Sequence, residues 1–225
     1  MSASATIAAQ YDAYMKPLGR LRDGTLRPDL ALIASRVPTG ARVLDIGCGD
    51  GTLLAHLRTS KGVDGRGIEL ERPRVAEALA RGVPVIQGDA DRDLTHYPDK
   101  SFDVTILSKT LQATRDTAGV LRNLVRIGNR AIVSVPNFGH WRARWQLAVE
   151  GRMPVNRHMP YEWWDTPNIH FCTIRDFDAL AKHVNARVVE RHVLNAEGSP
   201  IGVLGAIGPF ANVLGQQAVY VLEAR

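Results

Sequence analysis

The chain has only two cysteines, Cys48 and Cys172, and no apolar run approaches the roughly 20 residues needed to span a bilayer. Two isolated cysteines make no disulfide framework, so we expect a reducing, cytoplasmic compartment and no membrane partner. The first residues lack a basic region followed by an apolar core, which argues against a signal peptide. The 225 residues are enough for one domain with a substantial core, and 23% of them are charged, as in ordinary globular proteins.

Several motifs that would point to other functions are also missing. No metal site is expected, because His170 and Cys172 stand two apart without a second ligand pair. No Asn/Asp-Pro-Pro-aromatic motif supports methylation of nucleic-acid amino groups. The net charge is only +5, and basic residues gather only between 141 and 158, where arginines mix with tryptophans. A dedicated nucleic-acid binder usually has a denser patch, so nucleic acid is the least favoured partner.

Strands and helices alternate along most of the chain. Short apolar runs predict strands at 42–46, 65–70, 84–87, 102–107, 130–135, 187–194 and 217–222. Helices are predicted from Pro28, after Gly51, and over 73–81, 115–127 and 173–184, the last opened by a capping pair of Thr173 and Asp176. This alternation predicts an α/β three-layer sandwich, in which helices cover both faces of a seven-stranded, mostly parallel sheet.

We divide the chain into a leader or lid at 1–26 and one domain at 27–225. If the leader is a lid, Tyr11 and Tyr14 reach a ligand bound to the domain. Residues 137–172 break the alternation and form an insertion that contains all four tryptophans. The glycine-rich segment 198–215 is predicted to be a connection within the domain.

A glycine-rich loop follows the first predicted strand. The strand runs into Asp45, and Gly47, Gly49 and Gly51 follow at alternate positions before a helix. Glycines let the backbone approach a ligand closely, but this is not the G-x-G-x-x-G pattern of dinucleotide sites, and a carboxylate would serve a pyrophosphate poorly. It would serve a cationic amino group well, and S-adenosylmethionine (SAM) has such a group and no phosphate. SAM or S-adenosylhomocysteine is therefore the predicted cofactor, with a plain tight turn as the alternative.

Two more acids end the next two strands. Glu69 suits paired hydrogen bonds to ribose hydroxyls, and Asp89 suits the exocyclic amine of adenine, because ligands of open α/β sheets bind at the carboxyl ends of strands. Taken alone, Asp45 could be a helix cap and Glu69 a solvated acid. The three acids together, in this order and at this spacing along the chain, favour a ligand-binding site. The predicted cofactor contacts are Asp45, Gly47, Cys48, Gly49, Glu69, Leu70, Asp89, Ala90 and Ser108.

Five segments carry a closer resemblance. They are Arg27-Pro28-Asp29-Leu30, Val43-Leu44-Asp45-Ile46-Gly47-Cys48-Gly49-Asp50-Gly51, Leu111-Gln112-Ala113, Ser134-Val135-Pro136-Asn137-Phe138-Gly139-His140-Trp141 and Asp165-Thr166-Pro167-Asn168-Ile169-His170. Over about residues 27–194 the chain resembles the MetW family of methionine biosynthesis proteins. The glycine segment is common to many methyltransferases, whereas the last two segments are far more specific.

This resemblance implies a Rossmann-like class I methyltransferase fold and a role beside a homoserine O-acyltransferase of the MetX family. It carries over, as SAM contacts, Asp45, Gly47, Gly49, Glu69 and Asp89. The sequence departs from the family pattern Ser-Gln-Thr-Leu-Gln at one position, because Lys109 follows Ser108 near the expected methyl donor. The leader is also longer than the family leads us to expect.

Methyl transfer needs little from a protein beyond alignment of the acceptor, so the lack of a catalytic triad does not exclude an enzyme. If a base is needed, His140 and His170 are the candidates, with a structural role for each as the alternative.

Three hypotheses follow: a SAM-binding subunit that activates or regulates the acyltransferase, an independent small-molecule methyltransferase, and an RNA methyltransferase. The first leads, because tryptophan and arginine are enriched at interfaces and gather in the insertion. Self-association stays open.

Overall fold

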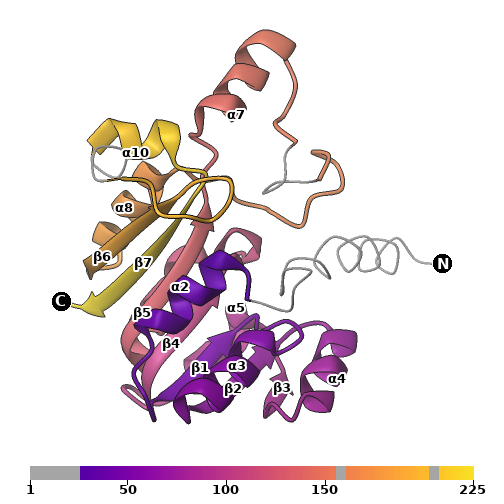
Figure 1. Cartoon of the computed structure of the whole chain (residues 1–225), viewed down its shortest axis with the longest axis vertical. Helices are drawn as coiled ribbons and strands as arrows, with labels where there is room; N and C mark the ends of the chain where they lie inside the picture. Colours follow the sequence, from indigo (N-terminus) through magenta and orange to yellow (C-terminus); the bar gives the residue numbers. More distant parts are fainter. Residues whose placement is uncertain (1–25, 156–160, 203–207) are drawn as a thin grey trace.

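A seven-stranded sheet organises the chain, with the strand order β3-β2-β1-β4-β5-β7-β6 (Figure 1). The computed structural model describes residues 26–155, 161–202 and 208–225. The strands are β1 (Arg42–Ile46), β2 (Asp64–Glu69), β3 (Val85–Gln87), β4 (Phe102–Ser108), β5 (Gly128–Pro136), β6 (Ala186–Leu194) and β7 (Gln217–Ala224). Neighbours pair in parallel from β3 to β5, and β7 is antiparallel to both of its neighbours. This confirms the predicted seven-stranded, mostly parallel sheet.

Helices connect the strands. They are α2 (Pro28–Arg36), α3 (Thr52–Lys61), α4 (Arg72–Ala80), α5 (Ala90–Asp93), α6 (Thr117–Ile127), α7 (Trp141–Trp145), α8 (Ile174–His183) and α10 (Gly208–Leu214), with the short turns η1 (Leu94–His96), η2 (Leu111–Ala113) and η3 (Gln146–Glu150). The predicted capping pair opens α8, since the Thr173 hydroxyl accepts from the Asp176 backbone and the Asp176 carboxylate from the Thr173 backbone. No helix in the described ranges is both long and apolar enough to cross a membrane.

Two apolar cores lie on the two faces of the sheet and explain the three layers. Successive strand residues point to opposite faces, so Ile132 joins one core and Val133 the other. The core with Ile132 packs under α2, α3 and α4, and the core with Val133 packs under α6, α8 and α10. Buried aliphatic side chains fill both cores, for example Leu57 in the core with Ile132 and Leu121 in the core with Val133. The predicted three-layer sandwich is therefore confirmed.

The strand order reverses between β1 and β4. From β1 the chain passes through α3 outward to β2, whereas from β4 it passes through α6 in the other direction to β5. The two connections diverge and leave the carboxyl ends of β1 and β4 uncovered, which is where open α/β sheets bind ligands. The residues that follow these ends are Gly47 and Lys109.

Several helices were absent from the sequence prediction. The segment predicted only as a connection contains α10, and the insertion at 137–172 begins with α7 and the π-helical turn η3, which stand above the end of β5 (Figure 1). Each is too short for apolar periodicity to be read, and α7 and η3 keep most of their apolar side chains exposed. The predicted leader or lid, with Tyr11 and Tyr14, lies almost entirely outside the described residues.

Asn137 joins the insertion to the rest of the domain. Its buried side-chain amide donates to the backbone oxygens of Asn212 and Gly215, at 2.9 and 2.6 Å. Its side-chain oxygen accepts from the backbone nitrogens of Gly139 and Ile174. One side chain thus fixes the end of β5 to the start of α7, to α8 and to α10, with every donor and acceptor of the amide used.

Asn137→Asp is expected to destabilise the fold by about 3 kcal/mol, because a carboxylate of the same shape cannot donate to the two carbonyls and buries a charge. Urea unfolding at pH 7 measures the loss. Asn129→Asp, at an exposed residue of β5, is the control and should change stability by less than about 0.5 kcal/mol. Equal stability of the two variants would contradict the structural role of Asn137.

Candidate cofactor cleft

The loop after β1 turns sharply because three alternate glycines have positive φ: 68° at Gly47, 58° at Gly49 and 74° at Gly51. The backbone nitrogens of Gly47 and Cys48 both donate to the Ile68 carbonyl, which ties the loop to β2. A Cβ on Gly47 would lie 2.6 Å from the Thr110 hydroxyl, so that position requires glycine. The nearest atom to a Cβ on Gly49 is 3.7 Å away, which leaves room beside the backbone for a ligand.

A cleft opens beside this loop, between α2, α3, α4 and the ends of β1 and β4. Five of the predicted contacts line it: Asp45, Gly47, Cys48, Gly49 and Ser108. Sequence reasoning missed the other lining residues, which are Arg27, Leu30, Asp50, Thr52, Leu53, Arg74 and Glu77. The cleft therefore combines the buried Asp45 and the partly buried Asp50 and Glu77 with two basic side chains, Arg27 before α2 and Arg74 on α4.

Asp45 is the most unusual group in the cleft. Its side chain is 3% exposed, and its Oδ1 atom accepts no hydrogen bond from any residue that the structure describes. Burial, and then the nearby charge of Glu69, raises the pKa of Asp45 to about 8. A buried acceptor without a partner is costly, so this atom suits a ligand that brings a cationic donor.

Glu69 is buried beside the glycine loop at the end of β2. Its Oε2 accepts from the Gly49 nitrogen at 2.8 Å and its Oε1 from the Glu71 nitrogen at 3.0 Å. Each carboxylate oxygen has a second lone pair, so these bonds leave acceptor capacity for a ligand. Glu69 thus holds the loop in shape, a role that the sequence did not reveal, and its contact with ribose stays a prediction.

The remaining predicted contacts lie at the ends of β2 and β3, outside the residues that line the cleft. Asp89 caps α5, where its Oδ1 accepts from the Asp91 nitrogen at 2.9 Å. Ala90 begins that helix, and Leu70 is 61% exposed although it is apolar. Their contacts with adenine stay predictions, and the exposed Leu70 side chain is suited to packing against a flat ring.

Lys109, the position that departs from the family pattern, takes part in a buried ion-pair cluster. It leaves β4 with a φ of 54°, and its Nζ lies 3.5 Å from Oδ2 of Asp29, which is 1% exposed and also pairs with Arg27. Burial alone would raise the pKa of Asp29, but Lys109 and Arg27 outweigh it and lower the pKa to about 2. In the sequence, Asp29 stands beside Leu30 on the buried face of a predicted helix. A buried acid at such a position indicates that a basic partner lies nearby.

Gln112 connects the cleft to the insertion. Its side-chain nitrogen donates to the Lys109 carbonyl at 2.7 Å, and its own backbone oxygen accepts from the nitrogens of Ile169 and His170. Two segments of the resemblance, the one around Gln112 and the more specific one around Ile169, therefore meet in space. The loop that carries Ile169 rests on the turn that directly follows the cleft.

Neither candidate base lines the cleft. His140 is buried and caps α7, where its Nδ1 accepts from the Arg142 nitrogen at 3.3 Å, and burial together with Arg142 lowers its pKa. His170 is exposed and its Nε2 lies 3.3 Å from the Arg115 carbonyl oxygen. Burial raises the pKa of Cys48, which keeps this cleft thiol protonated. Within the described ranges no three His, Cys, Asp or Glu side chains gather as a metal site would require.

Lys109→Met is expected to destabilise the protein by about 2–4 kcal/mol, because it leaves the buried Asp29 carboxylate with Arg27 alone. Asp29→Asn in the same background should recover about 1–2 kcal/mol of that loss, since the uncompensated charge is then gone. Denaturant unfolding of both single variants and the double variant gives the coupling. Strictly additive effects would refute the ion pair.

The chain was compared with known proteins. The family model described as methionine biosynthesis protein MetW matches residues 27–222. The bifunctional methionine biosynthesis protein MetXA/MetW of Rhodopirellula baltica is 34% identical over 177 residues, which are 75% of this chain and 28% of that protein. This chain therefore spans little more than a quarter of that relative.

Other similarities point to methyltransferases. The ubiquinone biosynthesis O-methyltransferase of Photorhabdus laumondii is 26% identical, over 83% of this chain and 77% of that protein. The crystal structure of a SAM-dependent methyltransferase of Thermotoga maritima superposes with a TM-score of 0.65 at 18% identity, over 97% and 96% of the two chains. That likeness shows the fold, which is the Rossmann-like class I methyltransferase fold. Since the family model covers most of the chain, this protein belongs to the MetW family.

Proposed function

We propose that this chain is a SAM-binding subunit that activates or regulates a MetX-type homoserine O-acyltransferase in methionine biosynthesis. The observation that carries the proposal is the Rhodopirellula baltica relative, whose name joins MetXA and MetW in one bifunctional protein. The part that this chain matches is only 28% of that relative, which leaves room for a separate MetXA unit. Covalent joining keeps two units at high effective concentration, so proteins that occur as separate chains must instead recognise one another.

The residues of the cleft fit SAM or S-adenosylhomocysteine. The unpartnered Asp45 carboxylate matches the cationic amino group of the methionine end, and Arg27 offers opposite charge to its carboxylate. Glu69 retains lone pairs for ribose hydroxyls, while Leu70, Asp89 and Ala90 stand at the neighbouring strand ends for adenine. When bound, SAM supplies an activated methyl group on its sulfonium. The protein's part is to hold the cofactor through opposite charges and the glycine loop.

A SAM-binding subunit beside this acyltransferase would sense the output of the pathway, since SAM is made from methionine. Such sensing requires cofactor occupancy to change partner affinity or activity by a coupling free energy of about 1–3 kcal/mol. The Gln112 contacts supply a short physical connection from the cleft to the insertion.

An independent small-molecule methyltransferase is the second candidate, favoured by the 26% identity to an O-methyltransferase. The RNA hypothesis is weaker. Among the arginines of the insertion, Arg144 donates to the Gly139 carbonyl at 2.6 Å, and the Arg142 guanidinium lies 5.3 Å from the centre of the Trp141 ring. The net charge is only +5, and the arginines of the insertion form no dense basic patch of the kind that binding to an RNA backbone needs.

Cofactor affinity is expected to rise about tenfold between pH 6 and pH 7, because Asp45 with a pKa of about 8 must lose a proton to pair with an ammonium group. The affinity rises with pH because Asp45 is mostly protonated below pH 8 in the free protein and is ionised in the complex. Titration calorimetry with S-adenosylhomocysteine in two buffers of different ionisation enthalpy should count about one proton released.

Asp45→Asn is the matched variant. It should bind S-adenosylhomocysteine about 10–100-fold more weakly, with no change between pH 6 and pH 7, because the charge-assisted hydrogen bond is lost. A wild-type protein that releases no proton and binds equally at both pH values would remove Asp45 from the cofactor site.

Homoserine acylation by the purified acyltransferase of the same organism should change when this chain is added, and should change further across a SAM titration. We expect a difference of about 5–150-fold between the cofactor-free and saturated states, the range of ordinary allosteric coupling. Asp45→Asn is the control, since it should keep the complex but shift the SAM response to higher concentration. Acylation that is the same with and without this chain, together with no complex by light scattering, would reject the accessory role. SAM turnover with a small acceptor would then favour the independent methyltransferase.

A further inference from the structure

Exposed aromatic side chains gather around the end of β5. Trp145, Trp163 and Trp164 are 60%, 67% and 68% exposed. With Trp141, Phe171 and Phe210 they form what we call the aromatic surface, carried by α7, the 161–171 loop and α10. The insertion and α10 also expose Leu147, Val149, Met153, Val155, Ile169 and Leu214. The remaining large exposed apolar residues of the described ranges are Leu70 after β2, Leu79 on α4, Ile86 on β3, and Val188 and Val189 on β6. Large exposed apolar patches of this kind usually mark an interaction site.

These aromatics are not needed for the core. The insertion does contribute to the fold through Ala143, which is 1% exposed, and through the Asn137 amide described above. Its tryptophans, in contrast, are between 47% and 68% exposed, so their removal leaves no buried cavity. A protein that needed them only for stability would bury them.

The backbone beneath the aromatic surface is nevertheless well held. The Phe138 nitrogen donates to the Cys172 carbonyl at 3.0 Å, and the Phe138 and Phe171 rings lie 4.2 Å apart. The nitrogens of Ile169 and His170 both donate to the Gln112 carbonyl. Side chains presented on such an anchored loop lose less entropy on binding, which favours recognition of a partner.

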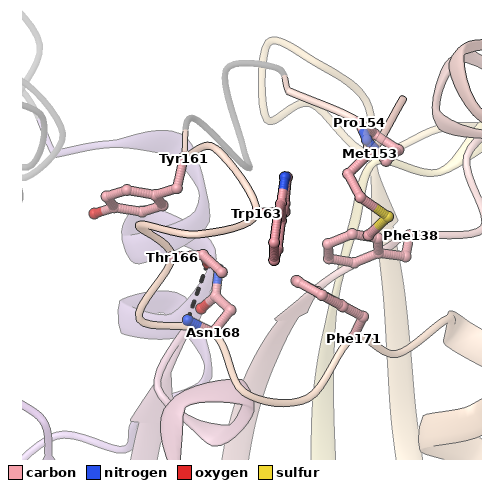
Figure 2. Close-up of a pocket in the computed structure, with 8 residues that line it drawn as sticks. All are labelled: Phe138, Met153, Pro154, Tyr161, Trp163, Thr166, Asn168 and Phe171. Atoms are coloured by element: carbon pink, nitrogen blue, oxygen red, sulfur yellow. Dashed lines mark hydrogen bonds between the residues drawn. The ribbon is translucent and has the colours of Figure 1, made fainter. Parts of the chain in front are cut away.

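A small hollow, lined by Trp163 and Phe171 of this surface, opens at the 161–171 loop (Figure 2). Figure 2 shows the Trp163 indole standing between Phe138 and Met153 on one side and Thr166 and Asn168 on the other. The Thr166 hydroxyl accepts a hydrogen bond from the Asn168 backbone nitrogen at 3.1 Å. An apolar centre beside a polar rim is the arrangement found at protein–protein interfaces.

We propose that the aromatic surface is the docking site for the MetX-type homoserine O-acyltransferase, an inference that rests on the function proposed above. The bifunctional relative supplies the occupant, because there a MetXA unit is joined to a unit that resembles this chain. Tryptophan is the residue most enriched among interface hot spots, which also favours a protein partner over a small ligand. The docking face of the partner is apolar at its centre.

The test measures binding of the purified acyltransferase to the full-length chain by biolayer interferometry. Trp145→Ala and Trp163→Ala are each expected to raise the dissociation constant at least tenfold, because each removes a large exposed anchor. Leu79→Ala is the matched control. Leu79 is similarly exposed, at 55%, but lies on α4 beside β3, away from the insertion (Figure 1), and its removal should change the constant less than twofold.

Each variant is also titrated with S-adenosylhomocysteine, and unchanged cofactor affinity shows that the domain is intact. If the wild-type chain binds the acyltransferase and both tryptophan variants bind equally well, the docking site is wrong while the proposed function stands. If the variants lose self-association in sedimentation without losing acyltransferase affinity, the surface joins two copies of this chain and the proposal is overturned. If the wild-type chain does not bind the acyltransferase, the proposed function and this inference fall together.

Discussion

The four hydrogen bonds of the Asn137 side chain determine how the functional parts of this protein are placed. β5 and β6 run in the same direction, because β7 is antiparallel to both, so the chain crosses from the end of β5 through α8 back to the start of β6. Asn137 stands at that crossing and bonds to α10, to the start of the insertion and to α8. The aromatic surface is held against the sheet through this junction, and the arrangement depends on an amide because only an amide both donates and accepts there.

The cleft depends on a different principle, the balance of buried charges. Burial, and then the nearby charge of Glu69, disfavours ionisation of Asp45 and raises its pKa. Asp29 is just as buried, but Lys109 and Arg27 keep its pKa low. The charge of Asp29 is thus balanced by the protein itself, whereas Asp45 Oδ1 has no hydrogen-bond partner in the described part of the chain, and this contrast is the basis for proposing Asp45 as a binding group.

The sequence predicted the sheet well, because short apolar runs mark strands and β1 begins and ends where expected. It also predicted that Asp45, Glu69 and Asp89 end three neighbouring strands, which follows from strand boundaries alone. It did not predict the partners of Asn137, which are about 75 residues away, or the ion pair between Lys109 and Asp29. Such contacts join segments that the fold brings together, and no local pattern encodes them. α10 was missed because seven residues are too few for helical periodicity.

The two ends of the insertion lie within hydrogen-bonding distance of one side chain, since Asn137 Oδ1 accepts from both Gly139 and Ile174, and Phe138 pairs with Cys172. A segment whose first and last residues are hydrogen-bonded to each other in this way forms a closed loop on the surface of the domain. Changing the length of such a loop costs little, because the closure entropy grows only with the logarithm of length. The surface that α7 and the 161–171 loop present is therefore free to diverge between relatives, or to be exchanged as a unit by engineering, without any change in the sheet that bears it.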